Sequence, residues 1–127
     1  MSDMNVLLVQ PESYPKAVTI GSDLESLQAA VGGSIEVVYP FADPVALICN
    51  DEGKLLGLQP NRALYSADTG GAYDVVVGTF FLCGAPAGAE DFASLTDEQM
   101  QKYKKRFFKP EWFVNMGGCL LAIPSHD

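Results

Sequence analysis

The sequence predicts an α+β fold, in which a mainly antiparallel sheet of five to seven strands has two helices packed on one face. Residues 35–39 and 45–49 are apolar runs rich in Val and Ile, which favour strands. The second run lacks polar alternation, as is typical of a strand buried on both faces, and it is predicted to form the centre of the sheet. Two capping-box patterns elsewhere in the chain mark the beginnings of the two helices.

The first thirty residues predict a hairpin followed by a helix. Residues 5–9 and 17–20 are apolar and are separated by turn-forming residues, so they are expected to pair. Ser22 fits the N-cap of a helix that has Glu25 at its third position. Gly32 is expected to end this helix, since glycine accepts the left-handed conformation.

The middle of the chain predicts strands interrupted by loops. After a polar turn, residues 55–58 are expected to pair back on the preceding strand. Residues 58–64 break the apolar pattern and are predicted to form a loop or a single helical turn. Residues 74–84 read as one long strand, in which Gly78 indicates a bulge or a close backbone approach.

The second helix is the clearest local prediction. Thr96 and Gln99 form its capping box, and basic residues occupy its last turns. Its buried face is expected to carry three residues at helical spacing: Met100, Tyr103 and Phe107. Residues 111–116 are predicted to form a terminal turn or helix, and residues 119–123 one more strand.

Length and composition indicate a single domain over residues 1–127 in the cytoplasm. A chain of 127 residues with 48% hydrophobic and 19% charged residues is typical of a globular protein. No apolar run is long enough to span a bilayer, and no positively charged segment precedes an apolar one at the N-terminus, so neither a membrane nor a secretory signal is expected. The three cysteines lie in apolar settings, which favours reduced, buried thiols: Cys49, Cys83 and Cys119.

The net charge of −8 is unevenly distributed. Residues 1–101 carry 3 basic and 14 acidic side chains, whereas residues 102–127 carry 5 basic and 2 acidic ones. The acidic body disfavours direct nucleic-acid binding. Two interpretations of the acidic charge remain open. The protein could mimic DNA and inhibit a DNA-binding enzyme, or the charge could simply maintain solubility. The basic run 102–109 could contact phosphates or an acidic partner, although cations at a helix C-terminus also complement the helix dipole.

Asn61 and Arg62 are the most conspicuous polar pair, because they interrupt an apolar region. An arginine fork can hold a carboxylate or phosphate through two hydrogen bonds. The alternative is a structural pair, in which Arg62 binds a neighbouring carboxylate or the carbonyl groups at the end of a loop. Tyr39, Phe41 and Tyr65 are predicted to lie near the pair and to form an aromatic surface that binds protein partners.

Other site chemistry finds no support in the spacing. The three cysteines and His126 lack the close ligand pairs of zinc sites, and a histidine beside a frayed terminus cannot hold a catalytic thiolate. The glycine-rich segments match no nucleotide-binding motif. No catalytic residue, metal ligand or cofactor is therefore predicted, and the balance is against an enzyme.

Five motifs occur in a characteristic order along the chain: VVYPF, DPVALICN, LQPNRAL, GTFF and SLTDEQ. Together, over residues 24–113, they resemble a family of small uncharacterised bacterial proteins labelled domain of unknown function 3846. The resemblance implies a cytosolic bacterial protein encoded on a mobile genetic element, such as a conjugative transposon or a phage. It supplies no catalytic residues.

The leading hypothesis is therefore a non-enzymatic binding or interaction protein of a mobile element, with an unknown protein partner. The alternatives are an acidic DNA mimic that inhibits a host defence nuclease, and a binder of a small ligand bearing phosphate or carboxylate. A homodimer is also open, since an exposed edge strand in so apolar a sheet can pair with a second copy.

Overall fold

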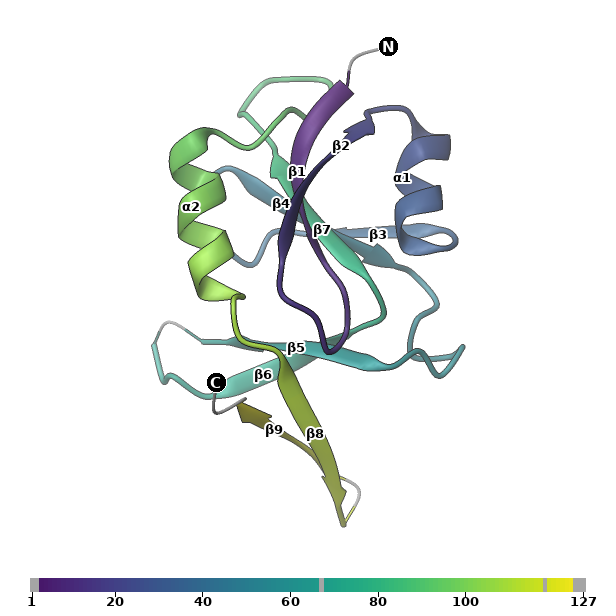
Figure 1. Ribbon diagram of the computed structural model, residues 1–127, viewed down its shortest axis with the longest axis vertical. Coiled ribbons are helices and arrows are strands. Elements are labelled where there is room, and N and C mark those ends of the chain that lie inside the picture. Colours follow the sequence, from purple (N-terminus) through teal and green to yellow (C-terminus); the bar gives the residue numbers. More distant parts are fainter. Residues whose placement is uncertain (1–2, 67, 118, 125–127) are drawn as a thin grey trace.

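The largest element of the computed structural model is a five-stranded antiparallel sheet with the order β2-β1-β7-β4-β3 (Figure 1). The structure describes residues 3–66, 68–117 and 119–124. The sheet contains β1 (Asp3–Val9), β2 (Lys16–Gly21), β3 (Ile35–Val38), β4 (Val45–Asn50) and β7 (Phe80–Gly84). Two antiparallel pairs accompany it, β5 (Pro60–Tyr65) with β6 (Ala72–Val77) and β8 (Glu111–Met116) with β9 (Cys119–Pro124). With the helices α1 (Leu24–Val31) and α2 (Asp97–Arg106), this confirms the predicted α+β class.

Every residue of β4 and of β7 is buried, as expected for strands covered on both faces. Successive side chains of a strand point to opposite faces. Leu47 and Leu82 therefore face one side and Ile48 and Phe81 the other. The prediction that residues 45–49 are buried on both faces is confirmed, but the middle strand of the five is β7, and β4 lies beside it.

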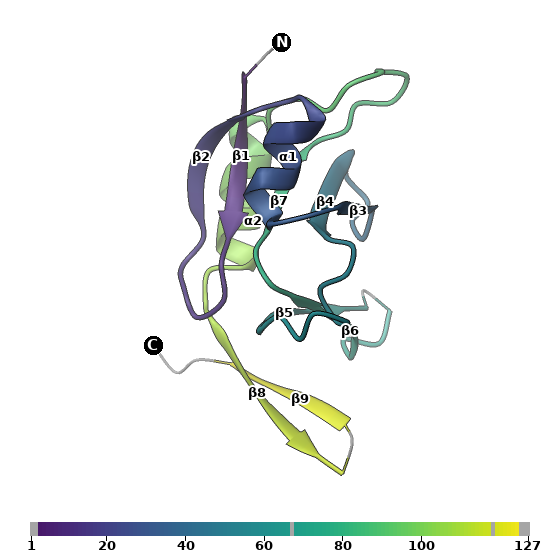
Figure 2. The ribbon, with the colours of Figure 1, turned by 90° about the vertical axis from the view of Figure 1, so that its right-hand side faces the viewer.

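The two helices lie on opposite faces of the sheet, so the predicted packing of both on one face is wrong (Figures 1 and 2). Tyr103 of α2 packs in the cluster that contains Leu47, whereas Leu27 of α1 packs in the cluster that contains Ile48. The cause is the unbroken apolar sequence of the inner strands. Two helices on one face would leave half of those side chains in water, at a cost of roughly 25 cal/mol per Å² of exposed apolar surface.

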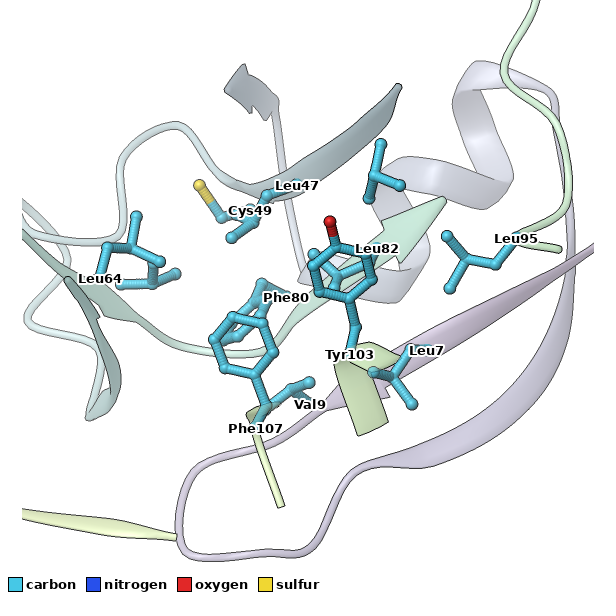
Figure 3. Packing of buried hydrophobic residues seen from close by; sticks show 12 residues of the cluster. Leu7, Val9, Leu47, Cys49, Leu64, Phe80, Leu82, Leu95, Tyr103 and Phe107 are labelled. Carbon is cyan, nitrogen blue, oxygen red and sulfur yellow. The ribbon is translucent and has the colours of Figure 1, made fainter. Parts of the chain in front are cut away.

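Figure 3 shows the cluster beneath α2, where aromatic rings meet aliphatic side chains of the inner strands. The Phe107 ring lies edge-on to the Phe80 ring, with 5.6 Å between the ring centroids. Tyr103 belongs to the same cluster as Leu82 and Leu7 and is 1% exposed. The predicted buried face of the second helix is confirmed, because Tyr103 and Phe107 are buried and Met100 packs against the same cluster.

Both helices begin at side-chain caps. In α2 the Gln99 N–H donates to the Thr96 hydroxyl and the Thr96 N–H donates to the Gln99 side chain, as predicted. α1 begins one residue later than expected, because Asp23 and not Ser22 accepts the free N–H of Ser26. Asp23 also accepts the Ser26 hydroxyl at 2.7 Å, so each of its two carboxylate oxygens accepts one bond from Ser26.

The region from residue 51 to residue 84 departs most from expectation. Residues 51–57 form turns instead of leading into a strand over residues 55–58, and the segment predicted as a loop contains the strand β5. The single strand predicted over residues 74–84 is divided at Gly78, whose φ of +74° is in the left-handed region. β6 and β7 therefore belong to different sheets.

The hairpin of β8 and β9 extends away from the main sheet (Figure 2), where a terminal turn or helix and one strand were predicted. Glu111 at its base is buried, whereas Trp112, Val114 and Ile123 are exposed. Within the described ranges, neither helix has the length and apolar character needed to cross a bilayer.

Candidate functional site

Asn61 and Arg62 lie on β5 in the interior of the protein, with 0% and 1% of their surfaces exposed. The Asn61 amide nitrogen donates to the carbonyl of Val9 at 2.9 Å and to that of Gly78 at 2.8 Å. It therefore connects β5 to the end of β1 and to the break between β6 and β7. These bonds satisfy both amide hydrogens of Asn61.

The five N–H groups of Arg62 all have acceptors within the protein. Nε and Nη2 donate to the Phe107 carbonyl at 3.2 and 3.1 Å, and Nη2 also donates to the Ser13 carbonyl at 2.6 Å. Nη1 donates to the backbone and side-chain oxygens of Asn61. Phe107 is the C-cap of α2, so the guanidinium binds the carbonyl that ends the helix. This is the structural alternative left open by the sequence.

Glu111 places a second charge in the same region. Its carboxylate accepts the Ala63 N–H at 3.0 Å and the Tyr65 hydroxyl at 2.8 Å, which anchors β8 to β5. Burial lowers the pKa of Arg62, and the nearby Glu111 carboxylate opposes that shift. Burial and the same carboxylate raise the pKa of Tyr65 to about 12. Sequence reasoning missed Glu111, although a lone acid at the start of an apolar run is a recognisable signal.

Phe41 and Tyr65 line one surface groove of about 430 Å³ between α2 and the end of β5. We call it the aromatic groove. Its remaining lining residues come from the turn before β4, from β5 and its following loop, and from α2: Pro40, Ala42, Ser66, Lys102, Tyr103 and Arg106. The Phe41 and Tyr103 ring centroids are 4.5 Å apart, and the Arg106 guanidinium lies 5.1 Å from the Phe41 ring centroid.

Asp43 fixes the wall of the aromatic groove that α2 provides. Its carboxylate accepts Lys102 Nζ at 2.7 Å and the Tyr103 hydroxyl at 2.8 Å. The bonds from Lys102 and Tyr103 hold the pKa of Asp43 below its ordinary value, while burial and Asp43 raise that of Tyr103. Lys102 is thus paired, whereas Arg106 has no ion pair among the described residues.

Tyr39 lies apart from the aromatic groove. It is 64% exposed and lines a separate hollow of about 220 Å³ with Pro86 and Phe92. Of the three aromatic residues that were predicted to lie together, the structure therefore brings Phe41 and Tyr65 to one site and places Tyr39 at another. The predicted polar pair supports the groove from inside, because Arg62 joins β5 to the end of α2.

Cys49 and Cys83 are free, buried thiols. Burial raises the pKa of each to about 12, and the Glu36 carboxylate contributes at Cys49. A thiol with so high a pKa is almost entirely protonated at neutral pH and is a poor nucleophile or metal ligand. Among the described residues, no three His, Cys, Asp or Glu side chains gather as a metal ion would require, and His126 lies outside those residues.

The fold and groove define a small α+β protein whose antiparallel sheet carries one helix on each face. The model of the family described as Domain of unknown function (DUF3846) matches residues 4–108, and the chain belongs to this family. The match includes both walls of the aromatic groove and ends before β8. No curated protein and no solved structure matches the chain.

Proposed function

We propose that the protein is a non-enzymatic binding protein, which holds a segment of another protein in the aromatic groove. The observation that carries the proposal is the placement of Arg106. Its guanidinium lies over the Phe41 ring in the groove that Tyr65 also lines, and it has no ion pair among the described residues. A cation held against aromatic side chains is a common anchor at protein interfaces, where arginine and tyrosine are enriched.

The interior supports this use of the groove. Arg62 binds the carbonyl at the end of α2, and Asn61 binds the carbonyl of Gly78, so β5 is held in place before a partner arrives. A preformed site loses less conformational entropy on binding. In this proposal Asn61 and Arg62 act by positioning, while Phe41, Tyr65 and Arg106 touch the partner. In this proposal Tyr39 does not touch the partner in the groove, because it lines a separate hollow.

The proposed setting is the cytoplasm of a bacterium that carries the gene on a mobile element. The family resemblance supports the mobile element, and the protonated, buried thiols at Cys49 and Cys83 fit a reducing compartment. Sequencing the DNA that flanks the gene tests the first point. Integration or transfer genes are expected beside it, and their absence would count against a mobile origin.

The test of binding is a tagged pull-down from host lysate with quantitative mass spectrometry. Arg106→Glu and Tyr65→Ala are expected to reduce the captured partner at least about fivefold, a loss of roughly 1 kcal/mol. Lys16→Glu makes the same charge change as Arg106→Glu at an exposed position on β2 and is expected to leave capture unchanged. Equal capture by all four proteins would show that the groove does not bind the partner.

A second candidate is a small ligand with a carboxylate or phosphate, and the free guanidinium of Arg106 favours it. A thermal-shift screen with phosphorylated metabolites separates it from the first, since a ligand that binds the native state raises the melting temperature. The rise is expected in the wild type and not in Arg106→Ala.

The DNA-mimic alternative draws its support from the acidic body, where Glu36, Asp51 and Asp74 line one cleft of about 270 Å³. It predicts inhibition of a defence nuclease that added DNA relieves. Inhibition that is unchanged by DNA would exclude mimicry.

A further inference from the structure

We propose that the outward side of α2 is a second binding surface, which takes an acidic peptide segment of a partner protein. We call it the lysine face. Its residues line a shallow hollow of about 580 Å³: Gln101, Lys104, Lys105, Arg106, Phe108 and Lys109. In Figure 1 α2 stands at the margin of the fold, with the sheet on its other side. The lysine face and the aromatic groove share only Arg106.

The three lysines of this face lack the ion-pair partner that Lys54 and Lys102 have. Among the described residues no ion pair is found for Lys104, Lys105 or Lys109, nor for Lys16, which stands alone on β2, whereas the three face lysines are clustered. The chain has 16 acidic and 8 basic side chains, so a carboxylate near each lysine would be the ordinary arrangement. Of the side chains that the structure describes, no carboxylate lines the hollow.

The helix dipole does not account for the whole cluster. Cations in the last turn of a helix contribute roughly 0.3–1 kcal/mol each, and the effect fades within that turn. Lys109 lies beyond the end of α2. The C-cap carbonyl of Phe107 already accepts two hydrogen bonds from the buried Arg62 guanidinium. The end of the helix is therefore supplied with a cation from inside, and the outer lysines remain available.

An aromatic side chain supplies an apolar contact on the same surface. Phe108 is 47% exposed, and its ring packs against that of Tyr14 with 4.8 Å between centroids and a tilt of 32° between the ring planes. This contact holds the ring at the edge of the lysine cluster. A peptide with carboxylates on either side of an apolar residue suits this surface, because its carboxylates can pair with the lysines while its apolar residue contacts Phe108.

The charge of the remaining chain favours a short peptide over a nucleic acid. Residues 1–101 carry 14 acidic and 3 basic side chains, which repel a long polyanion. At physiological ionic strength charges are screened over roughly 8 Å, so a peptide confined to the lysine face feels mainly its cations.

Fluorescence anisotropy tests the proposal with a labelled peptide in which six glutamates flank one phenylalanine. Saturable binding to the wild type is expected at low salt, and the matched peptide with glutamine for glutamate is expected to bind at least about tenfold more weakly. Lys104→Glu/Lys105→Glu is expected to weaken binding by at least about tenfold. The control Lys16→Glu/Lys54→Glu changes the net charge equally and is expected to change affinity less than about twofold.

Lys104→Gln/Lys105→Gln and Phe108→Ala complete the set, since they add no acid to the end of the helix, and each is expected to weaken binding about threefold or more. Four results would overturn the proposal. They are no binding to the wild type, equal losses in the two charge-matched double variants, tighter binding of a 20-nucleotide single-stranded DNA at the same salt concentration, and lysine-dependent self-association in sedimentation velocity. None of these depends on the aromatic groove.

Discussion

Replacing Arg62 with methionine tests the interior connection on which the aromatic groove depends. Methionine keeps much of the side-chain volume but removes all five donors. The Phe107 carbonyl and the Asn61 side-chain oxygen then lose a hydrogen-bond partner in the interior, and the half-buried Ser13 carbonyl loses one as well. Each buried polar group left unsatisfied costs roughly 1–3 kcal/mol. The change also leaves the Glu111 charge without the nearby cation.

Part of this loss is recovered, because methionine carries no charge that must be desolvated. We therefore expect the free energy of unfolding to fall by about 3–5 kcal/mol, the range measured when one member of a buried charge network is removed. Single domains are stable by roughly 5–15 kcal/mol in total, so the variant should remain folded but near its limit. Arg62→Lys is expected to lose at least about 2 kcal/mol, because one ammonium cannot reach the four acceptor oxygens that the guanidinium fork reaches.

Urea unfolding followed by far-ultraviolet circular dichroism measures both variants. Arg106→Met is the matched control, since it removes an exposed arginine that stacks on Phe41, and it is expected to cost less than about 1 kcal/mol. A loss below about 1 kcal/mol for Arg62→Met, with an unchanged spectrum, would refute the argument. The argument would also be refuted if Arg62→Lys had the same free energy of unfolding as the wild type.

Three further perturbations follow from individual positions. Gly78→Ala is expected to destabilise the protein by about 1–3 kcal/mol in urea unfolding, because φ is +74° and a Cβ would lie 2.7 Å from a leucine side chain. With Cys119 replaced by serine, Cys49 and Cys83 have pKa values of about 12, so alkylation at pH 8 should be about 10³-fold slower than in urea-unfolded protein. Asp43→Ala is expected to lower the melting temperature at pH 7, and the difference from the wild type should shrink as the pH falls below 3.8, since a carboxyl with a depressed pKa stabilises the fold only while it is ionised.

The unbroken apolar runs contain enough information to predict that both faces of the sheet are covered. Runs such as residues 45–49 placed the inner strands and their burial correctly. The same runs also require cover on both faces, because consecutive side chains of a strand alternate. Ile48 and Phe81 could be buried only by a helix on the second face, as α1 provides. The alternation of side chains along the strands could therefore have predicted one helix on each face of the sheet.

The strand β5 was hidden by its own buried polar residues. Asn61 and Arg62 interrupt the apolar pattern, and a local pattern cannot show that their donors meet the carbonyls of Val9, Ser13 and Phe107. Those acceptors are 45 or more positions away in the sequence. Polar residues can lie in an interior strand once every hydrogen bond is made, and only the tertiary structure reveals that condition.

The aromatic groove could not be predicted from a local pattern either, since its walls come from three separate parts of the chain. Phe41, Tyr65 and Arg106 converge there because Arg62 joins β5 to Phe107, the C-cap of α2. Substitutions at the surface of the groove should therefore affect binding alone, whereas substitutions in its interior support should affect both binding and stability. Arg106→Glu removes a contact at the surface and should weaken binding while the melting temperature stays near that of the wild type. Arg62→Lys touches no partner, yet it loosens one wall against the other, so it should weaken binding as well as stability. If binding proved insensitive to Arg62→Lys at a temperature where that variant is fully folded, the groove would not depend on its interior support.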